Sequence, residues 1–236
     1  MTTNRKQYAT GRLTAVTGAA TVEDAFKSGV RRLNLDEKKD GLIYVPHSYD
    51  KKQPAALAVM LHGAGAPAEN GLSLLQRYAD ARNIILLAPA SRSYSWDIIA
   101  TDAFGPDVIF IDQALSFIFK YFAINQNRIA IGGFSDGASY AFCLGLTNGD
   151  LFTHIIAFSP GFAYAPEKKG KPAVFISHGE YDPVLPIDSC SRRIVPQLQR
   201  QGLEVNYIEF RGRHEVPSNI SGSAVAWFTG SPSPSL

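Results

Sequence analysis

The feature that most constrains this chain is a strand–turn–helix pattern centred on Ser135. The run Arg128–Gly132 predicts a short buried strand, and the run Ala138–Leu146 predicts a buried helix. Between them stands a G-x-S-x-G sequence, Gly133-Phe134-Ser135-Asp136-Gly137. A sharp turn here holds the serine in a strained conformation and lifts its hydroxyl clear of the sheet, while the glycines let strand and helix approach. The pattern predicts Ser135 as a nucleophile.

A serine hydroxyl is a weak nucleophile at neutral pH, so this turn predicts a histidine base and a carboxylate that orients it. In this architecture the acid and then the base follow the serine in the chain. Of the histidines that follow, His154 lies in an apolar run and His178 precedes the best acid candidate. His214 follows the predicted strand Val205–Phe210 in a loop before the last helix, so His214 is the predicted base.

The predicted acid is Asp182, in the loop after the strand Ala173–Ser177. Pro183 restricts the backbone of Asp182 to extended or turn geometry, which helps to fix the direction of the carboxylate. Two alternatives lie in the same region. Glu180 follows the strand too closely to be preferred, and Asp188 is expected to cap the next helix.

An oxyanion hole needs two backbone N–H donors. One is expected from Asp136, after the nucleophile, and the other from Ala64, in the His62-Gly63-Ala64-Gly65 loop that follows the predicted strand Leu57–Leu61. His62 is expected to shape this loop rather than to act as a base. The chain holds neither a dinucleotide nor a P-loop glycine pattern, and no zinc or calcium spacing, so neither a cofactor nor a metal is expected.

Four motifs together resemble the phospholipase/carboxylesterase family of α/β-hydrolases, which includes acyl-protein thioesterase-like serine esterases. They are Leu61-His62-Gly63-Ala64-Gly65, Gly133–Ala141, His178–Pro186 and His214-Glu215-Val216-Pro217. The resemblance implies Ser135 as nucleophile, Asp182 as acid and His214 as base. It implies the amides of Ala64 and Asp136 as the oxyanion hole, and short- to medium-chain acyl esters or thioesters as substrates.

Two positions depart from the family pattern. Asp136 stands where acyl-protein thioesterases often have Gln, which weakens any inference about acidic or phospholipid substrates. Arg213 stands where Gly commonly precedes the histidine; it is expected to point to solvent, with an anionic substrate group as the alternative partner.

Short apolar runs alternate with amphipathic segments, which predicts an α/β fold. We expect an α/β-hydrolase fold with a mostly parallel central sheet, helices on both faces and an antiparallel hairpin over residues 31–46. Residues 1–30 are expected to be an N-terminal extension, 31–228 a single domain and 229–236 a flexible tail. Single helices are expected over residues 71–81, 107–122 and 218–228. The connection Pro160–Lys171 is too short for a cap domain, which predicts an open groove.

Aromatic and apolar residues on loops are candidates for the walls of this groove. The predicted substrate contacts are Trp96, Tyr94, Phe162 and Leu185. Trp96 is the first choice, because a large ring in a polar loop needs something to cover.

Composition limits the kinds of binding partner and the cellular location that we expect. With 23 Lys and Arg against 21 Asp and Glu, the net charge of +2 predicts no nucleic-acid partner. The two cysteines suggest no disulfide framework. The N-terminal residues lack the apolar core of a signal peptide, and no apolar run is long enough for stable membrane insertion, so a cytoplasmic location is expected. The oligomeric state is left open.

The sequence thus predicts a serine carboxylesterase that acts on a small-molecule ester through an acyl-enzyme. An acyl thioesterase or lysophospholipase would use the same residues. A non-catalytic binding protein on the same fold is the alternative from a different class.

Overall fold

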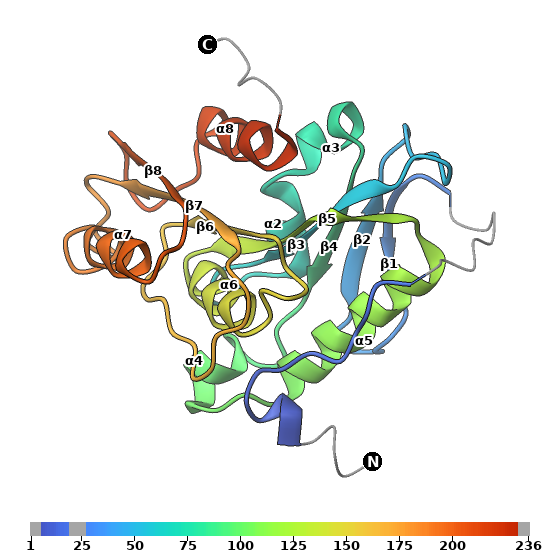
Figure 1. The fold of residues 1–236 in the computed structure, drawn as a ribbon, viewed down its shortest axis with the longest axis horizontal. Coiled ribbons are helices and arrows are strands. Elements are labelled where there is room, and N and C mark those ends of the chain that lie inside the picture. Colours follow the sequence, from blue (N-terminus) through green and yellow to red (C-terminus); the bar gives the residue numbers. More distant parts are fainter. Residues whose placement is uncertain (1–5, 19–26, 231–236) are drawn as a thin grey trace.

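The computed structural model describes residues 6–18 and 27–230. At its centre is an eight-stranded sheet with the strand order β1-β2-β4-β3-β5-β6-β7-β8 (Figure 1). β1 and β2 form an antiparallel hairpin, β2 pairs antiparallel with β4, and β3 to β8 run parallel to one another. The strands are β1 Gly29–Arg32, β2 Gly41–Val45, β3 Ala55–Leu61, β4 Ile84–Pro89, β5 Ile124–Phe134, β6 His154–Phe158, β7 Ala173–Gly179 and β8 Val205–Phe210.

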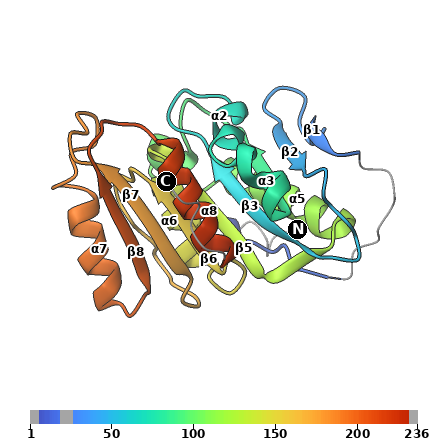
Figure 2. The ribbon, with the colours of Figure 1, turned by 90° about the horizontal axis from the view of Figure 1, so that it is seen from above.

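Helices cover both faces of the sheet (Figures 1 and 2). One face packs against α2, α3 and α8, and the other against α5, α6 and α7. Successive residues of β3 point to opposite layers: Leu57 and Val59 join the α5–α6 side, whereas Ala58 and Met60 join the α8 side. The helices are α2 Ala68–Ser73, α3 Gln76–Arg82, α4 Asp97–Thr101, α5 Pro106–Tyr121, α6 Asp136–Thr147, α7 Ser191–Arg200 and α8 Ser218–Thr229. This arrangement confirms the predicted fold class.

The connection between β6 and β7 carries no cap. Residues 159–172 are all described and contain no helix. This connection therefore places no helix over the carboxyl ends of the parallel strands, as the sequence predicts.

Two local expectations are wrong, and one helix had not been foreseen. The single helix expected over residues 71–81 is divided into α2 and α3, because Leu75 adopts φ −125° and ψ −7° between them. The short helix α4 was not expected. Asp188 does not cap the next helix, since α7 begins at Ser191 with Cys190 as its N-cap.

Residues 6–18 lie against α5 and the end of α6. The Asp112 carboxylate accepts hydrogen bonds from the backbone N–H of Thr14 at 2.7 Å and of Ala15 at 2.8 Å. Asn148 Oδ1 accepts another from the N–H of Leu13 at 2.9 Å. The first strand starts at residue 29, just before the predicted boundary. Of the predicted tail, residues 231–236 lie outside the described residues.

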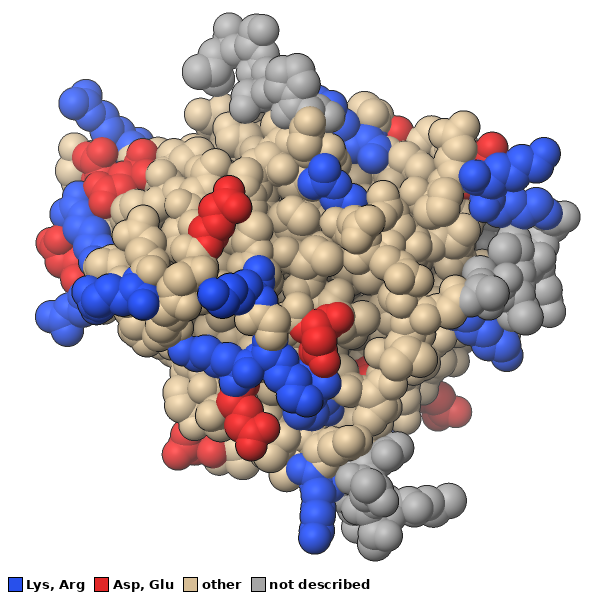
Figure 3. Space-filling view, in the orientation of Figure 1, with Lys and Arg blue, Asp and Glu red and all other residues tan. Residues whose placement is uncertain are grey.

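The surface carries mixed charge. On the face shown in Figure 3, Lys and Arg side chains are scattered and have Asp and Glu among them, rather than forming a basic stripe. None of the helices in the described ranges has the length and apolar character needed to cross a bilayer.

Candidate active site

Ser135 lies at the turn between β5 and α6. Its backbone has φ +57° and ψ −121°, a conformation that costs a non-glycine residue about 1–3 kcal/mol. The Ser135 N–H donates to the carbonyl of Phe158 on the neighbouring strand at 3.0 Å, which helps to hold the turn in place. A Cβ on Gly137 would lie 2.3 Å from the Leu61 carbonyl oxygen, so only glycine allows this approach between α6 and the end of β3. The turn has the strain and the close packing that the sequence predicts.

Ser135, His214 and Asp182 form one chain of hydrogen bonds. The hydroxyl oxygen of Ser135 lies 2.9 Å from His214 Nε2, and His214 Nδ1 lies 2.6 Å from Asp182 Oδ2. Because a carboxylate only accepts, Nδ1 carries the proton and Nε2 is free to accept from the serine. The structure therefore brings together the three residues selected from the sequence. The alternative acid Asp188 is directed elsewhere and pairs with Arg192 at 2.8 Å.

Sheet pairing explains why residues 32 positions apart meet. β7 and β8 stay in register up to Gly179 and Phe210. Beyond the sheet, the N–H of Glu180 donates to the Phe210 carbonyl and the N–H of Tyr181 donates to the Gly212 carbonyl. The loop that carries Asp182 and the loop that carries His214 are thus hydrogen-bonded to each other.

The Asp182 carboxylate is buried, and both of its oxygens accept hydrogen bonds. Its Oδ1 accepts from the backbone N–H of Val184 at 2.8 Å and of Leu185 at 2.9 Å. Burial alone would raise the pKa of this carboxyl, but the bonds from His214 and the two amides outweigh it and hold the pKa below its usual value. Asp182 is therefore ionised at neutral pH.

His178 contributes a second imidazole beside the acid, a role that the sequence reasoning missed. Its Nε2 donates to the Leu185 carbonyl at 2.7 Å and lies 3.2 Å from Asp182 Oδ2. Its Nδ1 accepts from the Ser191 hydroxyl at 2.7 Å. Burial lowers the pKa of His178, so the ring is neutral and supports the acid loop. The signal was its place in the His178–Pro186 motif.

The backbone amides of Ala64 and Asp136 are candidates for the oxyanion hole. The loop that contains Ala64 lies against the nucleophile, since a Cβ on Gly63 would be 3.5 Å from Ser135 Cβ. Within the described part of the chain, no group accepts a hydrogen bond from the N–H of either Ala64 or Asp136. Two donors beside the serine are thus available to a ligand.

Comparison with known proteins assigns the family. A sequence model of the phospholipase/carboxylesterase family matches residues 108–225, which are half of the chain and include Ser135, Asp182 and His214. The chain belongs to the phospholipase/carboxylesterase family. No curated protein matches the sequence at a significant level.

Solved esterase structures share the fold of this family member. Esterase PE8 is 21% identical with a TM-score of 0.68, over 82% of this chain and 99% of that one. An S-formylglutathione hydrolase from Staphylococcus aureus is 16% identical with a TM-score of 0.67, over 86% and 100%. The Bacillus cereus carboxylesterase is 16% identical with a TM-score of 0.61, over 83% and 95%.

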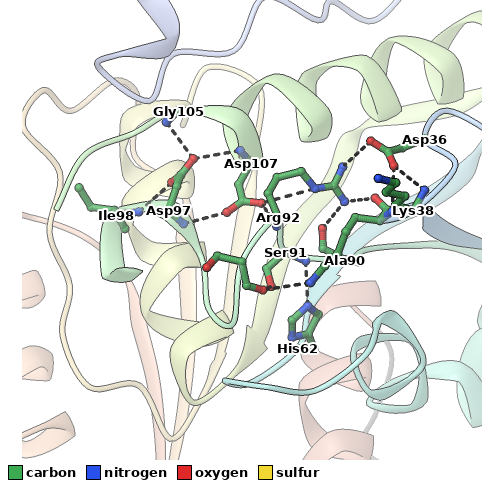
Figure 4. A network of polar contacts seen from close by, with 12 residues as sticks. Asp36, Lys38, His62, Ala90, Ser91, Arg92, Asp97, Ile98, Gly105 and Asp107 are labelled. Carbon is green, nitrogen blue, oxygen red and sulfur yellow. Dashed lines mark hydrogen bonds and ion pairs between the residues drawn. The ribbon is translucent and has the colours of Figure 1, made fainter. Parts of the chain in front are cut away.

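In this phospholipase/carboxylesterase family member, a buried polar network supports the Ala64 loop (Figure 4). Asp97 and Asp107, at the starts of α4 and α5, each accept the backbone N–H of the other, at 3.0 and 2.8 Å. Asp107 also accepts a hydrogen bond from the N–H of Arg92 at 2.6 Å. The N–H of the preceding residue, Ser91, donates to His62 Nε2 at 3.0 Å. Burial raises the pKa of Asp107 to about 6, and the nearby Asp97 carboxylate adds to this shift.

His62 itself is 2% exposed and belongs to the loop structure. Its Nδ1 donates to the Gly63 carbonyl at 2.7 Å, while Nε2 accepts from Ser91. Burial lowers the pKa of His62, which keeps the ring neutral. These contacts fit the expectation that His62 shapes the loop.

The prediction that Trp96 contacts substrate is wrong. Its side chain is fully buried, with its ring 4.7 Å from that of His62 and stacked 5.2 Å from that of Tyr140. Its indole N–H donates to the His62 carbonyl at 2.9 Å. Both faces of the ring and its N–H group contact other parts of the protein, so Trp96 supports the Ala64 loop instead of contacting a substrate.

The other predicted substrate contacts lie at the surface around the site. Tyr94 is 74% exposed and its ring rests against Gly65; Phe162 is 38% exposed. Leu185 is half-buried beside Gly161. Arg213 is exposed, as expected. Across the described ranges, no three His, Cys, Asp or Glu side chains gather as metal ligands would.

Proposed function

We propose that this protein is a serine carboxylesterase that hydrolyses short- to medium-chain acyl esters. The observation that carries the proposal is the hydrogen-bonded chain from Asp182 through His214 to Ser135, with the serine held at a strained turn. Membership of the phospholipase/carboxylesterase family supports the same chemistry.

The reaction proceeds in two acyl-transfer steps. His214 Nε2 takes the proton of Ser135 as the serine oxygen attacks the ester carbonyl, and ionised Asp182 holds the imidazole and stabilises its charged form. The amides of Ala64 and Asp136 donate to the developing oxyanion; loss of one such donor typically costs about 100- to 1000-fold in rate. His214 then protonates the leaving alcohol. Water repeats the sequence on the acyl-enzyme and releases the acid.

The absence of a cap between β6 and β7 favours substrates that fit an open groove. Tyr94 lies on the side of the Ala64 loop, whereas Phe162 and Leu185 lie in the loops that follow β6 and β7. We assign these three side chains to contacts with the acyl and alcohol groups. An acyl chain of a few carbons would cover their exposed apolar surface.

Thioester and lysophospholipid hydrolysis would use the same residues, so we retain them as alternatives within the proposal. Matched oxygen esters and thioesters of one acyl group would separate the first, and lysophosphatidylcholine would test the second. A cytoplasmic location remains a prediction of the sequence.

The test is the hydrolysis of p-nitrophenyl esters from acetyl to palmitoyl by the wild type and by Ser135→Ala. We expect activity that peaks at short to medium chains and that Ser135→Ala abolishes. Ser93→Ala, at an exposed serine on a nearby loop, is the control and should keep wild-type activity. A fluorophosphonate should label the wild type and the control but not Ser135→Ala. Substantial hydrolysis by Ser135→Ala would contradict the assignment, and absence of both hydrolysis and labelling would favour a binding protein.

A further inference from the structure

The Ser91–Trp96 loop, which follows β4, contacts both segments that carry the proposed oxyanion donors. It holds the segment of Ala64 through three hydrogen bonds. The Ser91 N–H donates to His62 Nε2 at 3.0 Å, and the Trp96 indole N–H donates to the His62 carbonyl at 2.9 Å. The Gly65 N–H donates to the Tyr94 carbonyl at 2.7 Å. These bonds involve His62, two residues before Ala64, and Gly65, the residue after it.

The same loop reaches the other donor through one side chain. The Ser95 hydroxyl donates to Asp136 Oδ2 at 2.5 Å. Ser95 is only 5% exposed, and Asp136 is half-buried. Hydrogen bonds from a hydroxyl to a carboxylate are short and strong, particularly where water is excluded. Asp136 is also the first residue of α6, where the helix favours a negative charge.

We propose that Ser95 is a positioning residue for the oxyanion hole: its bond to Asp136 fixes the amide of Asp136 relative to that of Ala64. This inference rests on the proposed esterase function. The two amides belong to segments that follow different strands, β3 and β5, and the Ser91–Trp96 loop is bonded to both. Preorganised donors act only when they are held at the place where the negative charge develops. A loop bonded to both segments meets that need.

The inference also gives a role to the departure of Asp136 from the family pattern. A carboxylate at this position accepts hydrogen bonds only, so it needs a donor, and the buried Ser95 hydroxyl is that donor. The charge of Asp136 is thereby engaged by the protein. A residue without an acceptor here would leave Ser95 buried without its partner.

The experiment compares Ser95→Ala with Ser93→Ala on a p-nitrophenyl ester that the wild type hydrolyses. We expect kcat of Ser95→Ala to fall about 10-fold, less than for the loss of an oxyanion donor, while KM changes by less than about two-fold. Binding of a trifluoromethyl ketone, which forms a tetrahedral oxyanion adduct with Ser135, should weaken by a similar factor. Ser95→Thr keeps the hydroxyl and should restore most of kcat. Ser93→Ala, without a buried bond to lose, should match the wild type.

A double-mutant cycle adds a test that does not depend on one variant. Asp136→Ala should lower kcat by a similar factor, and the Ser95→Ala/Asp136→Ala double variant should lose little more than either single variant, because both remove the same bond. The inference is overturned if kcat of folded Ser95→Ala stays within about two-fold of wild type, or if the two losses multiply. Should wild-type hydrolysis prove independent of Ser135, the proposed function fails, and this inference fails with it.

Discussion

Gly137→Ala tests whether the position of the nucleophile depends on close contact between α6 and β3. A methyl group at residue 137 would lie 2.3 Å from the Leu61 carbonyl oxygen and 2.5 Å from that of His62. Both contacts fall below the 3.0 Å that real Cβ atoms essentially never cross. The atoms are backbone and cannot rotate away. The start of α6 and the end of β3 must therefore separate by roughly 0.7 Å, a strain that a packed interior resists.

Two effects of this substitution oppose each other. Alanine gains about 0.5–1 kcal/mol over glycine within a helix. Overpacking against fixed backbone costs about 3 kcal/mol or more, at the upper end of the usual range. The steric effect prevails, and we expect a net loss of about 2 kcal/mol in the free energy of unfolding. Because the shift separates Ser135 from the Ala64 loop, kcat should also fall about 100-fold.

Gly145→Ala is the matched control in the same helix. Its new methyl would meet carbons of Ile155 at 2.6 and 2.7 Å and of Ile131 at 2.9 Å, which are side-chain and not backbone atoms. We expect a loss of stability but a nearly unchanged kcat, because the clash lies away from the site. Urea denaturation followed by circular dichroism gives the stability, and p-nitrophenyl acetate hydrolysis gives kcat. The reasoning is refuted if Gly137→Ala is no less active than Gly145→Ala.

Three further predictions concern the acid, a buried histidine and the groove. In Asp182→Asn the amide would face the Nδ1–H of His214 and favour the wrong tautomer, so kcat should fall about 10³- to 10⁴-fold with the fold intact by circular dichroism; a loss below about 10-fold would contradict the role of Asp182. Burial, followed by the charge of Arg128, lowers the pKa of His154 to about 4 from 6.5. Between these two pKa values, His154 is protonated in the unfolded chain but neutral in the folded protein. The free energy of unfolding therefore falls as the pH drops through this range. Urea titrations at pH 7.5 and 4.5 measure this fall in each protein. The free energy of unfolding of His154→Gln should fall by about 1–2 kcal/mol less than that of the wild type, a difference reduced because His154 is partly exposed. Equal falls in the two proteins would refute the prediction. Phe162→Ala should raise KM about 3- to 10-fold for medium-chain esters and little for acetate, as measured by p-nitrophenyl ester kinetics; equal changes for both would remove Phe162 from the acyl contacts.

The hydrogen-bonded residues of the site were predictable because their signals are local or follow chain order. The glycines beside Ser135 indicate a sharp turn that only glycine allows at these positions. The acid and the base each follow a strand whose apolar run is easily recognised. Parallel strands then bring their carboxyl ends to one edge without further information. The sequence therefore predicted which side chains meet although it contained no distance.

The direction of a side chain on a loop was not predictable in the same way. Trp96 was expected at the surface, but its ring lies between two other rings beneath the Ala64 loop. An irregular loop has no hydrophobic periodicity that would separate its buried side from its exposed side, and an aromatic ring can lie on either side. The division of the expected helix at Leu75 has a similar origin, since Leu75 is fully buried between α2 and α3 and packing overrides helix propensity there.

The bond between Ser95 and Asp136 shows why supporting residues are harder to find than reacting ones. A nucleophile, an acid and a base must be particular residue types, which limits the candidates to a few positions. A supporting bond needs only one donor and one acceptor, and the chain has many of each. Ser95 and Asp136 are 41 residues apart and belong to no common motif. What distinguishes the pair is the burial of Ser95, because a hydroxyl that is removed from water must be satisfied within the protein, and its bond therefore joins the two segments.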